Sequence, residues 1–110
     1  MRIGSLAPDE REPSVMMHGW LNLTGSEWRV TVVFNTRKLK DVMPDWIVLV
    51  GPHDKDATTE AGALWNKKSA KGVYYLSGTI KIAGMGMSVI VWVDENTGVW
   101  TVNRRLDEKE

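Results

Sequence analysis

The chain has 110 residues, 43% of them hydrophobic and 25% charged, which is enough for one globular domain and too few for two. It contains no cysteine, which excludes disulfides, thiolate nucleophiles and Cys-ligated zinc. The formal net charge is zero, but residues 13–106 carry eleven basic and eight acidic side chains, a balance of +3. This excess is small beside that of non-specific DNA-binding proteins.

Residues 1–15 show no periodicity and are predicted to be an irregular lead-in. A single β domain is expected over 16–104, and a charged tail over 105–110. A first strand is predicted within 15–23. The clearest alternation of apolar and polar residues covers 28–35, where β-branched residues favour a strand over a helix.

The middle of the chain combines a wholly apolar run with a polar loop. Residues 46–50 (WIVLV) are stopped by Gly51-Pro52, a pattern typical of a strand covered on both faces. The polar segment that follows leaves room for one short helix within 55–68. Residues 73–82 then alternate. One side is predicted to carry Tyr74, Leu76, Gly78, Ile80 and Ile82, and the outward side Tyr75, Ser77, Thr79 and Lys81.

The last third of the chain reads as a hairpin. Residues 87–94 form a strand that is apolar on both faces, and residues 99–103 return antiparallel to it. Between them, Gly98 is free to take the positive φ that a hairpin turn needs. Six or seven strands result, which predicts an all-β fold: a small antiparallel barrel or a sandwich. An OB-like barrel is the most specific version, because its helix would fall within 55–68.

Two segments carry a resemblance to known proteins. Residues 44–51 read PDWIVLVG, and residues 62–77 read GALWNKKSAKGVYYLS. Together they are similar to a motif of small, uncharacterised phage and plasmid proteins, which form a family of unknown function common on proteobacterial plasmids. The resemblance covers about residues 16–94. It implies a mobile-element origin and a β-rich domain, and it supplies no catalytic residues.

A surface for single-stranded DNA or RNA is the first functional hypothesis. Such surfaces combine cationic side chains along the backbone with aromatic faces on which bases stack. The candidates are Trp65, Lys67, Lys68, Lys71, Tyr75, Lys81 and Arg29. A second basic cluster, Arg37, Lys38 and Lys40, would extend the surface if the fold brings it near. The competing interpretation is that Trp65 is a core residue and the lysines keep a sheet edge soluble.

A protein-interaction surface is the alternative hypothesis. Ile90 and Trp92 face away from Val89, Val91 and Val93 on the same predicted strand, so both of its faces are apolar. Trp100 would extend the outer patch across the hairpin. Such a patch indicates a homodimer interface or a site that inhibits a host protein.

No pattern in the chain indicates catalysis. His18 and His53 lack the spacing of a metal site, and neither Ser69 nor Ser77 stands in a nucleophile elbow. We therefore expect no enzyme activity, no metal and no cofactor. The apolar runs are much shorter than a membrane span, and the acidic residues near the N-terminus do not fit a signal peptide. A cytoplasmic protein without a membrane partner is expected.

Overall fold

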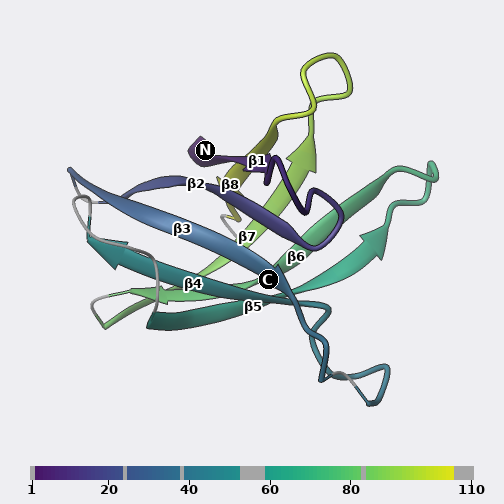
Figure 1. Ribbon diagram of the computed structural model, residues 1–110, viewed down its shortest axis with the longest axis horizontal. Helices are drawn as coiled ribbons and strands as arrows, with labels where there is room; N and C mark the ends of the chain where they lie inside the picture. Colours follow the sequence, from purple (N-terminus) through teal and green to yellow (C-terminus); the bar gives the residue numbers. More distant parts are fainter. Residues whose placement is uncertain (1, 24, 38, 53–58, 83, 106–110) are drawn as a thin grey trace.

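Eight antiparallel strands form a closed barrel in the computed structural model, and strands that are consecutive in sequence are neighbours in the sheet (Figure 1). The structure describes residues 2–23, 25–37, 39–52, 59–82 and 84–105. The strands are β1 (Arg2–Pro8), β2 (Met16–Leu23), β3 (Ser26–Phe34), β4 (Trp46–Pro52), β5 (Thr59–Lys68), β6 (Tyr74–Ile82), β7 (Met85–Val93) and β8 (Trp100–Arg104). Pairing of β1 with β8 closes the barrel. The predicted all-β class and small antiparallel barrel are confirmed.

Two strands lie where the sequence predicts something else. β1 occupies residues 2–8 of the expected irregular lead-in 1–15, because pairing with both β2 and β8 supplies its hydrogen bonds. The sequence left room for one short helix within 55–68, but from Thr59 onward this segment is β5, whose pairing with β4 contains a register shift that disturbs its alternation. Residues 53–58 lie outside the described residues. The barrel thus has eight strands in up-and-down order, unlike the five-stranded Greek key of an OB fold.

Because side chains point alternately inward and outward along each strand, aliphatic and methionine side chains from all eight strands fill the interior of the barrel. Among the described residues, no polar or charged side chain is buried. The predicted inward positions Leu76, Ile80 and Ile82 are in this core. Tyr74 is an exception: it was expected on the same face, but it lies at the mouth of the barrel and is 65% exposed.

The barrel consists of two four-stranded halves, β1–β4 and β5–β8, and the strands of one half pair in the same pattern as the corresponding strands of the other. In the first half, each glycine of β1 and β2 pairs with a buried leucine of the other strand; in the second, β5 and β6 repeat this with leucine and isoleucine. The pairs are Gly4 with Leu21, Gly19 with Leu6, Gly62 with Ile80, and Gly78 with Leu64. A Cβ at Gly19 would lie 1.8 Å from the Ser5 carbonyl oxygen, and one at Gly78 would lie 2.0 Å from that of Ala63. Glycine is therefore required where the paired backbones approach this closely.

The other pairings repeat in the same way. β3 and β4 begin their register with Phe34 opposite Trp46, and β7 and β8 begin theirs with Val93 opposite Trp100. Both junctions between the halves, β4–β5 and β8–β1, contain a register shift. The hairpin turns at Gly25 and Gly84 have φ angles of 82° and 81°.

The four connections 9–15, 35–45, 69–73 and 94–99 lie at one end of the barrel, which we call the loop end (Figure 1). The hairpin turns β2–β3 and β6–β7 lie at the opposite end. Gly98 has the positive φ of 75° expected for its turn. The described part of the chain contains no helix that could cross a membrane.

Candidate nucleic-acid interface

Two basic segments that are far apart in sequence both belong to the loop end. β4 pairs with β5, so the base of the connection 35–45, which enters β4, lies against Trp65 and Asn66 near the end of β5, whereas its tip and the connection 69–73 project in different directions (Figure 1). We call Arg37, Lys40, Lys67, Lys68 and Lys71 the basic side of the loop end. Lys38, the remaining member of the second predicted cluster, lies outside the described residues. The second predicted cluster therefore lies at the same end of the barrel as Lys67, Lys68 and Lys71, but the two segments project apart (Figure 1).

Trp65 joins these two segments. It lies on β5 next to the buried Leu64 and is itself partly buried. Its indole N–H donates a hydrogen bond to the carbonyl oxygen of Val42, with 3.1 Å between Nε1 and O. Trp65 therefore holds the connection 35–45 against β5, and its ring is less available for stacking than the hypothesis requires.

Lys67, Tyr75 and Trp92 form a cross-strand row on the outside of the barrel. Lys67 pairs with Tyr75, whose ring stacks on Trp92 with 4.5 Å between centroids. One candidate of the nucleic-acid surface thus contacts one candidate of the interaction surface. Trp92 covers one face of Tyr75, so only the other face could receive a base.

Tyr74 is a candidate that the sequence analysis missed. Its ring is largely exposed, and Lys68 Nζ lies 5.2 Å from the ring centroid, within cation–π distance. Tyr74 is the first residue of β6 and follows the turn at Gly72. Alternation no longer determines burial at the end of a strand. The position of Tyr74 at such an end could therefore have indicated that its ring is exposed.

Two candidates lie away from the basic side. Lys81 pairs with Gly86 close to the β6–β7 turn, at the opposite end of the barrel. Arg29 pairs with Trp20 on one side and with Gly51 on the other, also towards the end where β4 finishes. Both are exposed, but strand direction separates them from the lysines of β5.

The candidates for a protein interface divide between the two faces of the barrel wall. Ile90 and Trp92 point outward and are partly buried, as the sequence predicts. Trp100 does not extend this patch. It packs against the core, because its position on β8 shares the inward face with Val102.

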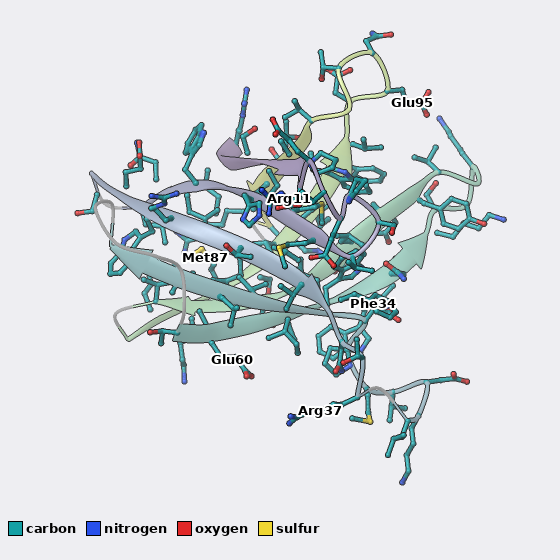
Figure 2. The ribbon with its side chains drawn as sticks, viewed as in Figure 1. Arg11, Phe34, Arg37, Glu60, Met87 and Glu95 are labelled. Atoms are coloured by element: carbon teal, nitrogen blue, oxygen red, sulfur yellow. The ribbon has the colours of Figure 1, made fainter. Side chains whose placement is uncertain are left out.

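The loop end also has an acidic side. It is formed by Asp9, Glu10 and Glu12 of the β1–β2 connection and by Asp94 and Glu95 of the β7–β8 connection. Figure 2 shows Arg37 and Glu95 projecting on opposite sides of the molecule. The separation of charge at this end is partial, because the β1–β2 connection also carries Arg11 and the connection 35–45 also carries Asp41 and Asp45.

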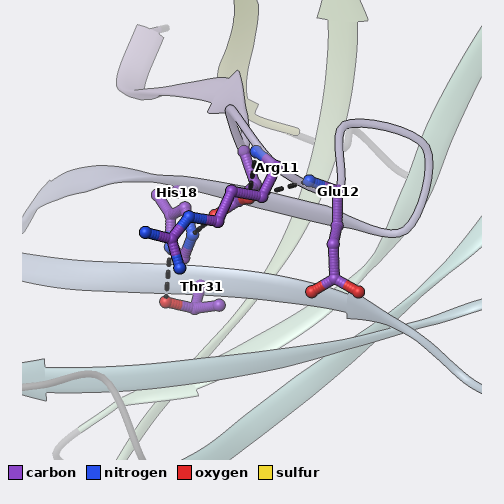
Figure 3. Close-up of polar contacts among 5 residues, drawn as sticks. Arg11, Glu12, His18 and Thr31 are labelled. Atoms are coloured by element: carbon purple, nitrogen blue, oxygen red, sulfur yellow. Dashed lines mark hydrogen bonds and ion pairs between the residues drawn. The ribbon is translucent and has the colours of Figure 1, made fainter.

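A polar network anchors the acidic β1–β2 connection (Figure 3). The Asp9 carboxylate accepts backbone hydrogen bonds from Arg11 and Glu12 at 2.8 and 2.9 Å. His18 contacts Asp9 through Nε2 at 2.7 Å and Thr31 through Nδ1 at 3.1 Å. The Glu12 amide, followed by His18 and the Arg11 amide, holds the pKa of Asp9 below its ordinary value.

This network links a carboxylate, an imidazole and a hydroxyl, but its three members lie on the outer surface of the barrel wall. It connects the β1–β2 connection to β3 across β2, which is a structural function. A metal-binding group of three or more His, Asp or Glu side chains is absent from the described residues.

The comparisons with known proteins identify a family and no activity. The profile of a family described as "Protein of unknown function (DUF736)" matches residues 2–101, which covers β1 to β7 and the first two residues of β8. No curated protein and no solved structure matches the chain. This agrees with the resemblance to a family of unknown function noted in the sequence. The chain belongs to the DUF736 family of proteins of unknown function.

Proposed function

We propose that this protein is a non-catalytic, cytoplasmic accessory protein of a phage or plasmid, and that it binds single-stranded DNA or RNA along the basic side of the loop end. The observation that carries the proposal is the exposed ring of Tyr74 beside Lys68, on the β5–β6 hairpin that also carries Lys67 and Lys71. Cationic side chains next to an accessible aromatic ring are what a flexible polyanion with stacking bases requires.

In this proposal each group has a role. Lys67, Lys68 and Lys71 neutralise phosphates, and Arg37 and Lys40 offer further contacts on the connection 35–45. Tyr74 offers a base its exposed ring, for which stacking contributes about 1–3 kcal/mol. The acidic side repels the backbone, which confines the strand to one half of the loop end.

Binding of a fluorescently labelled single-stranded oligonucleotide, followed by anisotropy at increasing salt, tests the proposal. We expect micromolar affinity at about 50 mM salt that weakens steeply as salt rises. Changing Lys67, Lys68 and Lys71 to alanine together should lower the magnitude of the slope of log K against log salt by about 2, because each phosphate contact on a single strand contributes about 0.7.

Lys81→Ala is the matched control, because Lys81 is an exposed strand lysine at the opposite end of the barrel. It should leave the salt slope unchanged. Absence of binding by the wild-type protein at about 50 mM salt would rule out the proposal, since the electrostatic contribution is then near its maximum.

A second candidate function is supported by Ile90 and Trp92, which are apolar and point outward from β7. We propose as the alternative that this face forms a homodimer or binds a host protein. The mass measured by light scattering should then be that of a dimer, insensitive to salt, and reduced to that of a monomer by Trp92→Lys. A wild-type monomer, or a dimer that Trp92→Lys leaves intact, would count against a homodimer through this face.

A further inference from the structure

The repeat places the β1–β2 connection and the β5–β6 hairpin at equivalent positions of the two halves. β1 and β2 pair in the same pattern as β5 and β6, with Pro8 at the position of Asn66. The residues that follow are equivalent in two pairs: Asp9 with Lys67, and Glu10 with Lys68. The two segments are four strands apart in a closed barrel of eight, so they lie on opposite sides of its mouth.

The two equivalent segments carry opposite charge. Residues 9–12 contain three acidic side chains and Arg11, a balance of −2, and we call them the acidic connection. Residues 67–71 contain three lysines and no acidic side chain, a balance of +3, and we call them the basic hairpin. Glu10, Glu12, Lys68 and Lys71 are exposed. Because the same pairing pattern carries both signs of charge, the barrel itself requires neither.

The basic hairpin extends further from the barrel than the acidic connection. β1 ends at Pro8, whereas β5 continues to Lys68, two residues beyond the equivalent position. At the rise of a β-strand this adds about 7 Å, and Figure 1 shows the hairpin projecting from the barrel. Each segment also presents an apolar side chain, since Tyr74 is 65% exposed and Val15, at the equivalent position, is 37% exposed. The basic hairpin can therefore reach a second molecule beyond the mouth of the barrel.

We propose that a second copy of this chain docks at the loop end, with the acidic connection of each copy against the basic hairpin of the other. A two-fold axis perpendicular to the barrel axis brings the two loop ends face to face. It forms both contacts at once, because the two segments lie on opposite sides of the mouth. In each contact the exposed glutamates of one copy face Lys68 and Lys71 of the other, and Val15 approaches Tyr74.

Charge complementarity selects a second copy as the occupant. A polyanion satisfies the basic hairpin and is repelled by the acidic connection, and a basic partner does the reverse. A second copy offers each segment its opposite, which fixes the orientation of the pair as well as its attraction. The formal net charge of the chain is zero, so no long-range repulsion keeps two copies apart.

The association also has a consequence for nucleic-acid binding, and this consequence rests on the proposed function. In the dimer, carboxylates of the second copy occupy the lysines that would otherwise neutralise phosphates. Dimerisation and binding of a single strand are therefore mutually exclusive at the basic hairpin. An oligonucleotide should convert the dimer to the monomer.

Sedimentation velocity of the full-length protein over a range of concentrations tests the association. At about 20 mM salt, the wild type should shift from monomer towards dimer as its concentration rises. At about 500 mM salt it should remain a monomer, because salt screens contacts between exposed charges. A monomer at every concentration in low salt, or a dimer that high salt leaves intact, would overturn the proposal. Growth beyond a dimer would overturn the two-fold arrangement.

Reversal of one charge in each segment tests the pairing. Glu10→Lys and Lys68→Glu should each weaken dimerisation about tenfold, because the reversed charge acts in both contacts. An equimolar mixture of the two variants should dimerise again, and so should a chain that carries both substitutions. Failure of the mixture to dimerise would contradict the pairing of the acidic connection with the basic hairpin.

Glu60→Lys and Lys81→Glu are the matched controls, because both residues are exposed at the opposite end of the barrel and the substitutions change the net charge equally. Both variants should dimerise like the wild type, and an equal weakening by them would overturn the assignment to the two segments. Repeating the sedimentation with a single-stranded oligonucleotide separates this inference from the proposed function. A protein that dimerises but does not bind the oligonucleotide would overturn the proposed function alone. Binding that leaves the dimer intact would overturn the competition.

Discussion

Tyr75 and Trp92 stack on the outside of the barrel, with their ring centroids 4.5 Å apart and their ring planes inclined by 29°. Tyr75 belongs to the candidate nucleic-acid surface and Trp92 to the candidate protein interface. The two proposed functions would therefore use the same aromatic pair. A base on Tyr75 must use the face that Trp92 leaves open.

The stack predicts an energetic coupling between the two rings. In a double-mutant cycle with Tyr75→Leu and Trp92→Leu, we expect a coupling free energy of about 0.5–1.5 kcal/mol, the range found for aromatic pairs beyond their buried area. Urea unfolding of the wild type, both single variants and the double variant measures it. Additive effects of the two substitutions would show that the stack contributes nothing to stability.

Trp65→Phe is predicted to loosen the connection 35–45. The substitution keeps an aromatic ring but removes the N–H that donates to Val42, a bond with a net contribution of about 1 kcal/mol. Hydrogen exchange should accelerate in the connection and remain unchanged in the β2–β3 hairpin. Unchanged exchange throughout 35–45 would mean that the other contacts at its base hold it without Trp65.

Gly78→Ala is predicted to destabilise the barrel, whereas Gly86→Ala should be nearly neutral. A Cβ at residue 78 would lie 2.0 Å from the Ala63 carbonyl oxygen, and the nearest atom to a Cβ at residue 86 is Lys81 Cε at 4.0 Å. The backbone must move in the first case, which costs about 1–3 kcal/mol or more. Thermal unfolding of the two variants gives the comparison. Equal melting temperatures would contradict the close approach of β5 and β6.

The Asp9 network predicts a dependence of stability on acid pH. The pKa of Asp9 lies below its ordinary value of 3.8 in the folded state, so the ionised carboxylate stabilises the fold above pH 3.8. This stabilisation is lost as the pH falls from there through the lowered folded pKa. Asp9→Asn should therefore reduce stability at neutral pH and flatten its decline in acid. Both effects are measured as the free energy of unfolding in urea at a series of pH values from 7 to below 3.8, with Glu10→Gln as the control.

The same network predicts a partial effect of His18. His18→Phe should raise the pKa of Asp9, but not to its ordinary value, because the amides of Glu12 and Arg11 still donate to the carboxylate. NMR titration of the Asp9 carboxyl carbon reports the shift. A pKa that returns fully to 3.8 would show that the two backbone hydrogen bonds do not form without the imidazole.

Alternation of side chains was enough to predict much of the barrel wall. It identified the strand around Val30 and Val32, the inward row of Leu76, Ile80 and Ile82, and the outward direction of Trp92. These features depend on the period of two that a strand imposes on its own residues. The turn at Gly98 was likewise predictable, because only the local backbone requires its positive φ.

The candidate site was predictable only in part. The cluster Lys67, Lys68 and Lys71 was found because its members are adjacent in sequence. The exclusion of Lys81 from it depends on strand direction, and the inward position of Trp100 depends on the register of β8 with β7. Tyr74 was predicted to face inward but is exposed, because alternation alone does not show which residues of a strand extend beyond the end of the barrel.

The all-β class and the apolar face of most strands could be predicted from the sequence, since both follow from contacts within a few residues. The number of strands, the closure of the barrel by β1 against β8, and the repeat of one register in the two halves became known only from the fold. The tertiary structure also places the connection 35–45 against Trp65 and Asn66 of β5. These features depend on pairing between residues far apart in the chain, which hydrogen bonds and burial of the shared core select together.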